Sequence, residues 1–269
     1  MVAPTCECPD PEMHPVGIAC IALVTDFGPG IYVGQVRARL SASVPGVPVI
    51  DLVHDLAPFR PDLAAYLLPA LVRDMPPGTL YFCVVDPGVG GERGGLIVEV
   101  GANWFLGPDN GLLSRVLHRA DHARPYRIGW SPKGQSASFH GRDWFAPLAA
   151  RLCLGQPLDL TELGRTDPAG AEWSDELAAV VYGDRYGNLM CGVRAASLPA
   201  GTRFRAAGRL LRRARTFCGV PPGEAFWYEN ALGLVEIAVN QGRADRLLGL
   251  EPGDKIELLS DGEAELAYV

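Results

Sequence analysis

Two short segments hold the side chains best suited to polar chemistry. Residues 86–93 read DPGVGGER and residues 139–143 read FHGRD, so together they supply Asp86, Arg93 and His140. An apolar segment at residues 79–85 ends just before Asp86, and the glycines after it let the backbone approach a ligand closely. A carboxylate that follows a buried strand and precedes such a turn is typical of the reactive edge of an α/β protein.

The spacing within the first segment leaves two interpretations open. Asp86 and Arg93 are seven residues apart across a glycine-rich loop, so the chain can fold back and bring guanidinium and carboxylate together. A structural ion pair that closes the loop, with His140 as an ordinary loop histidine, accounts for these residues as simply as a reactive site does.

A second carboxylate, Asp26, follows the first apolar segment and precedes the turn Phe27-Gly28-Pro29-Gly30. Such an acid can accept two hydrogen bonds from the hydroxyls of a ribose. A helix N-cap explains the same residue without any ligand. The glycine spacing differs from that of a dinucleotide-binding loop.

A third candidate is the turn Asp184-Arg185-Tyr186-Gly187-Asn188. Its glycine and Asx residues are those of a β-hairpin, which requires no ligand. In a binding site, however, Asp184 could pair with an ammonium group and Asn188 with the edge of a purine. The aromatic residues Phe217, Trp227 and Tyr228 are more typical of a core than of a stacking platform.

The elements that must position these residues form two patterns. From Ile18 to about Arg165 apolar strands alternate with amphipathic helices, which predicts an α/β domain with a mainly parallel sheet. After residues 167–170 short strands and turn residues predict a smaller β domain. We expect a flexible tail at 1–16, an α/β domain at 17–168 and the β domain at 174–269. The predicted strands are 18–24, 48–53, 79–85, 96–100, 104–107, 176–182, 189–193, 232–239 and 255–260, and the predicted helices are 31–43, 61–74, 111–119 and 146–153.

Composition limits the partners and the compartment. The 269 residues carry a net charge of −7, which argues against a nucleic-acid partner. The apolar run 16–24 is about half the length of a membrane span. Seven cysteines, mostly in apolar runs, indicate reduced thiols and predict a cytoplasmic protein. Cys6 and Cys8 with His14 form a weak metal motif for which a frayed tail is the better explanation.

One basic cluster stands out in the β domain. It consists of Arg203, Arg205, Arg209, Arg212, Arg213 and Arg215. No interleaved aromatic platform accompanies it, so a solvated β-hairpin is favoured over an RNA-binding strand.

In order and spacing, several motifs resemble those of the S-adenosyl-L-methionine hydroxide adenosyltransferases, over about residues 18–259. The motifs are Thr25-Asp26-Phe27-Gly28, Asp51-Leu52-Val53-His54, Val85 to Arg93, Gly107-Pro108-Asp109-Asn110-Gly111, Phe139 to Asp143, Asp184 to Asn188 and Glu236-Ile237-Ala238-Val239-Asn240. The resemblance implies a C-terminal β-barrel and a homotrimer with sites between subunits. It also implies hydrolysis of S-adenosyl-L-methionine to adenosine and L-methionine, without metal or cofactor, by in-line attack of water or hydroxide on the 5′ carbon.

The resemblance assigns roles residue by residue. Asp86, Arg93 and His140 would handle the water. The residues that would bind the substrate are Asp26 at the ribose, Phe59 near the ribose and adenine, Asp184 at the methionine ammonium, Tyr186 in the same turn, Asn188, Asn240 and Gln241 at the adenine edge, and Phe217 at the adenine face. Because Arg93 beside Asp86 weakens it as a base, we expect holding of hydroxide to matter more than proton abstraction by Asp86.

Two departures and two alternatives accompany this assignment. The related fluorinases and chlorinases carry tyrosine and threonine at the positions of Asp86 and Val89, and a carboxylate would repel a halide. Ala231 and Leu232 replace a serine and the arginine that holds the methionine carboxylate in fluorinases. The alternative functions are a halide-using transferase and a sensor of S-adenosyl-L-methionine or a nucleoside that binds without turnover.

Overall fold

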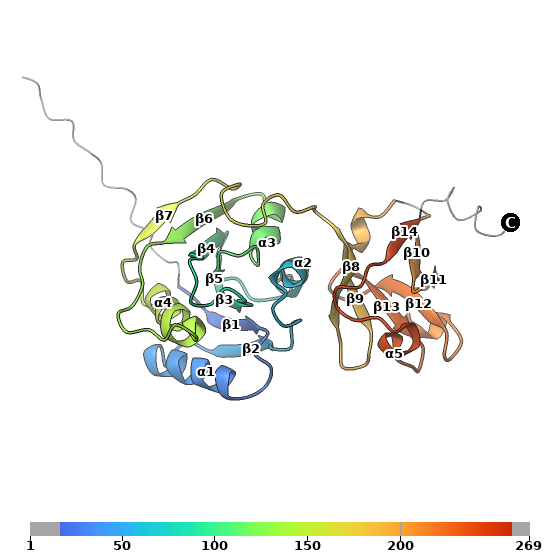
Figure 1. The fold of residues 1–269 in the computed structure, drawn as a ribbon, viewed down its shortest axis with the longest axis horizontal. Helices are drawn as coiled ribbons and strands as arrows, with labels where there is room; N and C mark the ends of the chain where they lie inside the picture. The colour runs from blue at the N-terminus through green and yellow to red at the C-terminus, as the bar shows by residue number, and fades with distance from the viewer. Residues whose placement is uncertain (1–16, 200, 260–269) are drawn as a thin grey trace, which may run out of the picture.

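The structure is a computed structural model and describes residues 17–199 and 201–259. Two seven-stranded sheets lie side by side along the long axis of the molecule (Figure 1). The first is flanked by helices and the second is curled on itself. The tail that contains Cys6, Cys8 and His14 lies outside the described residues.

The first sheet has the strand order β2-β1-β3-β5-β4-β6-β7. Its strands are β1 (Cys20–Thr25), β2 (Val49–Val53), β3 (Thr79–Val84), β4 (Gly95–Val100), β5 (Asn103–Pro108), β6 (Ala123–Ile128) and β7 (Leu160–Glu162). The pairs β1–β2, β1–β3 and β3–β5 are parallel, and every residue of β1 and β3 is buried. The predicted α/β domain with its parallel strands is thus confirmed. The sheet is mixed because β4, β6 and β7 pair antiparallel.

Helices cover both faces of this sheet. They are α1 (Ile31–Ser43), α2 (Pro61–Leu71), α3 (Ser114–Arg119) and α4 (Ala146–Cys153). The helices α1 and α4 lie on one face, whereas α2 and α3 lie on the face nearer the second sheet (Figure 1). The predicted helix at 61–74 ends earlier, at Leu71, and the one at 111–119 begins later, at Ser114. Strands β6 and β7 were not predicted, since Pro125 and two arginines interrupt the apolar pattern of β6.

The second sheet has the order β14-β10-β11-β12-β13-β9-β8. Its strands are β8 (Leu177–Gly183), β9 (Leu189–Arg194), β10 (Arg203–Ala206), β11 (Arg209–Arg213), β12 (Ala225–Glu229), β13 (Leu234–Val239) and β14 (Glu257–Leu259), and the helix α5 spans Ala244–Leu248. The sheet forms a strongly curled half-barrel around buried Phe204, Trp227 and Ile237. This confirms the β-barrel expectation in outline. Backbone hydrogen bonds from residues 253–256 to β8 bring the two edges together.

The basic cluster is the hairpin that the sequence indicates. Strands β10 and β11 pair antiparallel, with Phe204 opposite Leu211 and Arg205 opposite Leu210. Most of the arginines point to solvent, while Phe204, Ala206 and Leu211 are buried. The buried residues Phe204 and Ala206 of β10 alternate with its arginines and pack with Leu211 of β11, which explains why the hairpin forms despite its charge.

A buried arginine fixes the segment that joins the two sheets. Arg115 is fully buried and donates hydrogen bonds to the backbone carbonyls of Gly170, Trp173 and Ser174 at 2.8–3.0 Å. The Tyr66 hydroxyl donates to the Ser174 carbonyl as well, at 2.7 Å. One side chain therefore satisfies several backbone acceptors that would otherwise be buried unpaired. In the described residues no helix is long and apolar enough to cross a membrane.

We expect Arg115→Met to lower the free energy of unfolding by about 3 kcal/mol, because it leaves buried carbonyl groups without a donor. Chemical denaturation followed by tryptophan fluorescence measures this change. Arg124→Met is the matched control, since the Arg124 side chain is 57% exposed and pairs with Glu99 on the neighbouring strand. Equal stability of the two variants would contradict the role given to Arg115.

Candidate active site

Asp86 and Arg93 form a two-pronged ion pair just after β3. Arg93 Nε donates to both carboxylate oxygens of Asp86, at 2.9 and 3.1 Å, and a terminal nitrogen of Arg93 donates to Oδ2. The two side chains are only 5% and 10% exposed. The Arg93 guanidinium also lies 5.3 Å from the ring centroids of Trp144 and Phe145. The pair is therefore rigidly held in a place that excludes most water.

His140 joins the pair through its ring nitrogen Nδ1. A terminal nitrogen of Arg93 lies 2.8 Å from Nδ1. A guanidinium has no acceptor, so Nδ1 must accept this hydrogen bond and the ring proton must sit on Nε2. Burial first, and then the charge of Arg93, hold the pKa of His140 below its usual range. The imidazole is consequently neutral near pH 7.

Neighbouring loops position this group. Asn110 Nδ2 donates to the Val85 carbonyl at 2.9 Å and so fixes the backbone next to Asp86. Gly90 has a φ of 80° and lies so close to the Ala137 carbonyl that a Cβ would come within 2.5 Å of its oxygen. A π-helical turn, Gly141–Phe145, follows His140 directly. Such turns often occur at functional sites.

Asp86 and His140 border a hollow of ≈ 240 Å³, and Arg93 contacts both of them without lining it. Its lining is Asp26, Phe27, Tyr32, Pro58, Phe59, Val84, Asp86, Val89, Ser138, Phe139, His140 and Gly141, all from the first sheet and its loops. Asp26 Oδ2 accepts a hydrogen bond from the Phe59 amide at 3.1 Å, and burial raises the pKa of Asp26. Phe59 has a φ of 62° and is 72% exposed. Asp26 and Phe59, which the sequence predicts to lie near a ribose, are therefore in contact and both line the hollow.

A hydrogen-bonded relay of side chains stabilises the loop that contains Asp26. His54 Nδ1 lies 2.8 Å from Thr25 Oγ1, and His54 Nε2 lies 3.0 Å from an Asp51 oxygen. The His54 carbonyl accepts from the Gly28 amide at 2.7 Å. Arg37 completes the relay with a 2.5 Å ion pair to Asp51. The motif at residues 51–54 indicated this region, but its role could not be predicted because the contacts join segments that are distant in the sequence.

The remaining predicted residues lie in the second sheet, away from the lining of this hollow. Asp184 accepts hydrogen bonds from the amide and the side-chain nitrogen of Asn188, at 2.8 and 2.9 Å. Tyr186 is 75% exposed at the tip of the same turn. The turn is therefore a hairpin as the sequence indicates, and its exposed face is open to a ligand.

The other residues expected at an adenine lie next to strands β12 and β13. Asn240 Nδ2 donates to the Val220 carbonyl at 2.7 Å, and Gln241 has a φ of 54°. Phe217 packs edge-on against Phe226 and Tyr228. These aromatics form a small core, and Phe217 remains only partly buried.

Glu236 is a buried acid that sequence reasoning missed. It is 3% exposed and accepts hydrogen bonds from the Tyr228 hydroxyl and, at 2.8 Å, from Asn230 Nδ2. Burial first, and also the charge of Asp184, raise the pKa of Glu236. The sequence feature that could have indicated this residue is a glutamate within the otherwise apolar strand β13. Across residues 17–199 and 201–259, no three His, Cys, Asp or Glu side chains gather as a metal site would need.

Comparison with known proteins gives a consistent result. Residues 21–164 match the family model of the SAM hydroxide adenosyltransferase N-terminal domain, and residues 178–257 match that of the C-terminal domain. The (R)-S-adenosyl-L-methionine hydrolase of Thermus thermophilus is 36% identical over 259 residues, which cover 89% of this chain and 99% of the relative. The enzyme of the same name from Salinispora arenicola is 35% identical over 255 residues, covering 88% and 97%.

More distant relatives and solved structures agree. A fluorinase from an Actinoplanes species is 26% identical over 176 residues, 55% of this chain and 58% of the relative. The crystal structure of an uncharacterized conserved protein from Thermotoga maritima has a TM-score of 0.77 at 30% identity, covering 89% of this chain and all of that one. A conserved hypothetical protein from Thermus thermophilus gives a TM-score of 0.71 at 34% identity, covering 89% and 99%.

The arrangement of Arg93 and His140 predicts a titration. We expect the pKa of His140 to lie below 6.5 and to rise in Arg93→Met, because removal of the guanidinium leaves the attraction of Asp86 unopposed. NMR of the histidine ring protons measures both values, and Arg124→Met serves as the control. Since the unfolded chain takes up this proton first, stability should fall as the pH drops below about 6.5. An unchanged pKa in Arg93→Met would contradict the contact.

Proposed function

Because the chain belongs to the SAM hydroxide adenosyltransferase family, we propose that it hydrolyses S-adenosyl-L-methionine (SAM) to adenosine and L-methionine. The observation that carries this function is the group of Asp86, Arg93 and His140 beside a hollow that Asp26 and Phe59 also line. Relatives named (R)-S-adenosyl-L-methionine hydrolase match over nearly their whole length.

The chemistry of the substrate explains why the reaction needs only a few polar side chains. The sulfur of SAM leaves as a neutral thioether, so its departure needs no general acid. Water is a poor nucleophile, and in-line attack at the 5′ carbon requires it to be held within near-attack distance, opposite the sulfur. The main task of the protein is then to hold and polarise one water molecule.

We assign the roles from the hydrogen bonds. The proton of His140 sits on Nε2, so this ring donates to the water oxygen while it keeps its contact with Arg93. Asp86 Oδ1 accepts one Arg93 bond and retains a lone pair for a water proton. Arg93 holds both partners and stabilises negative charge as hydroxide develops. The geometry favours capture of a hydroxide ion from solvent over proton transfer to His140, since its attack forms the bond from oxygen to the 5′ carbon, breaks the bond from that carbon to sulfur and leaves no proton to remove.

The binding residues complete the proposal without a cofactor. Asp26 holds the ribose hydroxyls, with Phe59 beside the sugar. In the second domain Asp184 holds the methionine ammonium. The adenine is held by Asn188, Phe217, Asn240 and Gln241, and Tyr186 contributes to substrate binding from the same turn as Asn188. In support, Asn188 Oδ1 is left open when its Nδ2 donates to Asp184.

The limits of the domains and the location are also part of the proposal. We place the domains at 17–168 and 174–269 after a tail at 1–16, and the two family matches lie inside these limits. We place the protein in the cytoplasm, because in the described part Cys20, Cys83, Cys153, Cys191 and Cys218 are free thiols.

Incubation of the purified protein with SAM should yield adenosine and methionine in equal amounts, as chromatography measures. Asp86→Ala and His140→Ala should each lower turnover by about two orders of magnitude or more while SAM still binds. Glu92→Gln and His122→Ala are the controls. Both side chains are exposed; Glu92 is next to Arg93 in the sequence, and His122 lies elsewhere in the same domain. Tight binding without products would support the sensor, and 5′-halogenated adenosine on addition of chloride or fluoride would support the halide-using enzyme.

We also propose that the protein is a homotrimer in which two neighbouring subunits form each site. The hollow is lined by first-domain residues alone, and Ile31, Tyr32, Phe59 and Val89 on or beside its rim are exposed apolar side chains. Exposed apolar surface of this kind marks an interface or a ligand site. The second domain of a neighbouring subunit would cover this rim and supply Asp184 and Asn188.

Shared sites predict complementation between variants. Asp86→Ala and Asn188→Ala should each be inactive alone, and mixed trimers should regain activity because some sites combine two intact domains. Light scattering should give about three times the 28.8 kDa mass of one chain. A monomer in solution, or no recovery after unfolding and refolding of the mixed chains, would refute shared sites.

A further inference from the structure

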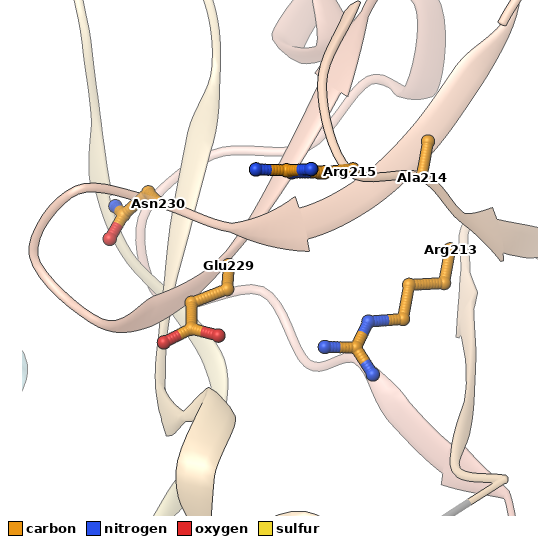
Figure 2. Close-up of a pocket in the computed structure, with 5 residues that line it drawn as sticks. All are labelled: Arg213, Ala214, Arg215, Glu229 and Asn230. Carbon is orange, nitrogen blue, oxygen red and sulfur yellow. The ribbon is translucent and has the colours of Figure 1, made fainter. Parts of the chain in front are cut away.

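The hollow beside Asp26 differs from a second one, of ≈ 610 Å³, in how its walls are held. The second hollow lies at the ends of β11 and β12, and its lining is Arg213, Ala214, Arg215, Glu229 and Asn230 (Figure 2). Its two arginines and its glutamate are exposed side chains, so ordering them around a ligand costs conformational entropy. Asp26, by contrast, lies in a loop that hydrogen bonds hold in the free protein.

Two loops that follow the adjacent parallel strands β1 and β2 are joined to each other around Asp26. The Gly28 amide donates to the His54 carbonyl at 2.7 Å, and the Phe59 amide donates to Asp26 Oδ2 at 3.1 Å. Phe59 has a φ of 62°, a backbone conformation that costs free energy for a residue with a side chain. Such a conformation persists only where surrounding contacts hold it.

A chain of hydrogen bonds with a single direction runs from Arg37 to the Asp26 loop. Arg37 pairs with Asp51 at 2.5 Å, so the Asp51 carboxylate acts as an acceptor. His54 Nε2, 3.0 Å from Asp51, must then donate, and Nδ1 of the neutral ring must accept. The donor to Nδ1 is the Thr25 hydroxyl at 2.8 Å, which leaves an Oγ1 lone pair for the Phe27 amide 3.4 Å away.

The strand register brings His54 next to Thr25. The pairing of β1 with β2 shifts by one residue between Leu23 and Val24, directly before Thr25. Irregularities of this kind change the direction of side chains and are common beside active sites. Thr25 is 1% exposed and the His54 side chain 15%, so water competes little for the hydrogen bond between them.

His54 lies behind the hollow and not in its wall. The lining includes Asp26, Phe27 and Phe59, but neither His54 nor Thr25. His54 therefore acts on a ligand through the loop that it holds. Its carbonyl fixes the Gly28 end of that loop, and its ring fixes the Thr25 end, with Asp26 between them.

We propose that His54 is a positioning residue for the ribose of SAM, which orients the Asp26 carboxylate toward the two ribose hydroxyls. The inference rests on the proposed function, in which Asp26 holds the ribose, and deepens it. Two neighbouring hydroxyls must meet one carboxylate at the same time, so a small rotation of the loop weakens both hydrogen bonds. Holding the loop before the ligand arrives raises the affinity for the ribose.

The test compares SAM with its 2′,3′-dideoxy analogue, which cannot donate to Asp26. In His54→Phe, which keeps a ring but loses both nitrogens, KM for SAM should rise about tenfold, the loss expected for one or two hydrogen bonds. The value of kcat should stay nearly the same, because the loss concerns binding and not the reacting atoms. His54→Asn should recover most of the affinity, since its amide can still accept from Thr25.

Calorimetry in the Asp86→Ala background gives the dissociation constants without turnover. The constant for SAM should rise in His54→Phe, whereas that of the dideoxy analogue should not change. Asp26→Ala should remove the effect of His54→Phe on SAM, because the two residues act through one contact. A role of His54 in general stability would weaken both ligands alike.

His122→Phe is the matched control, since His122 is exposed elsewhere in the same domain, and it should leave both constants unchanged. Thermal unfolding shows whether the variants are folded. Arg37→Met makes the same comparison if His54→Phe does not fold, because Arg37 is 40% exposed and its loss should raise KM for SAM by a smaller factor. Equal weakening of SAM and the analogue, a fall in kcat alone, or no effect on SAM would overturn the proposal.

The outcomes separate this inference from the proposed function. Wild-type protein that binds SAM without releasing adenosine would refute the proposed reaction alone, because the two dissociation constants still test His54. Wild-type protein that cleaves SAM but binds the dideoxy analogue equally well would refute the positioning role of His54, since Asp26 would then not hold the ribose.

Discussion

The buried pair of Asp86 and Arg93 is the interaction on which the site depends. Removing two charges from water is costly unless their geometry is good and their remaining donors are satisfied. Arg93 meets this requirement with both oxygens of Asp86, with His140 Nδ1 and with the faces of two aromatic rings. The glycine loop between them and the amide of Asn110 serve to keep that geometry.

The same pair determines what His140 can do. By using Nδ1 as an acceptor, Arg93 fixes the tautomer and leaves a donor on Nε2. Asp86 and His140 both line the hollow, and a hydroxide would suit this place better than a halide ion because its O–H can donate to Asp86 while its oxygen accepts from His140 Nε2. The tautomer that allows this follows from one hydrogen bond, the one between Arg93 and His140 Nδ1.

The sequence predicted those features of the site that depend on interactions between residues close together in the chain. The buried runs of β1 and β3 and the turn residues after them placed Asp26 and Asp86 at strand ends, and a spacing of seven residues allowed the Asp86–Arg93 contact. The relay of Thr25, His54 and Asp51 could not be predicted, because it joins two parallel strands whose register the sequence does not reveal. The π-helical turn after His140 and the burial of Glu236 likewise depend on tertiary packing.

The distribution of charge between the domains has a physical reason. The substrate carries a sulfonium and an ammonium but a single carboxylate, so acids are useful at several points of its path and cations at few. The proposed roles of Asp26, Asp86 and Asp184 put carboxylates at such points, in a chain of net charge −7. A net charge of −7 suits such a substrate, because acidic side chains attract its two cationic groups.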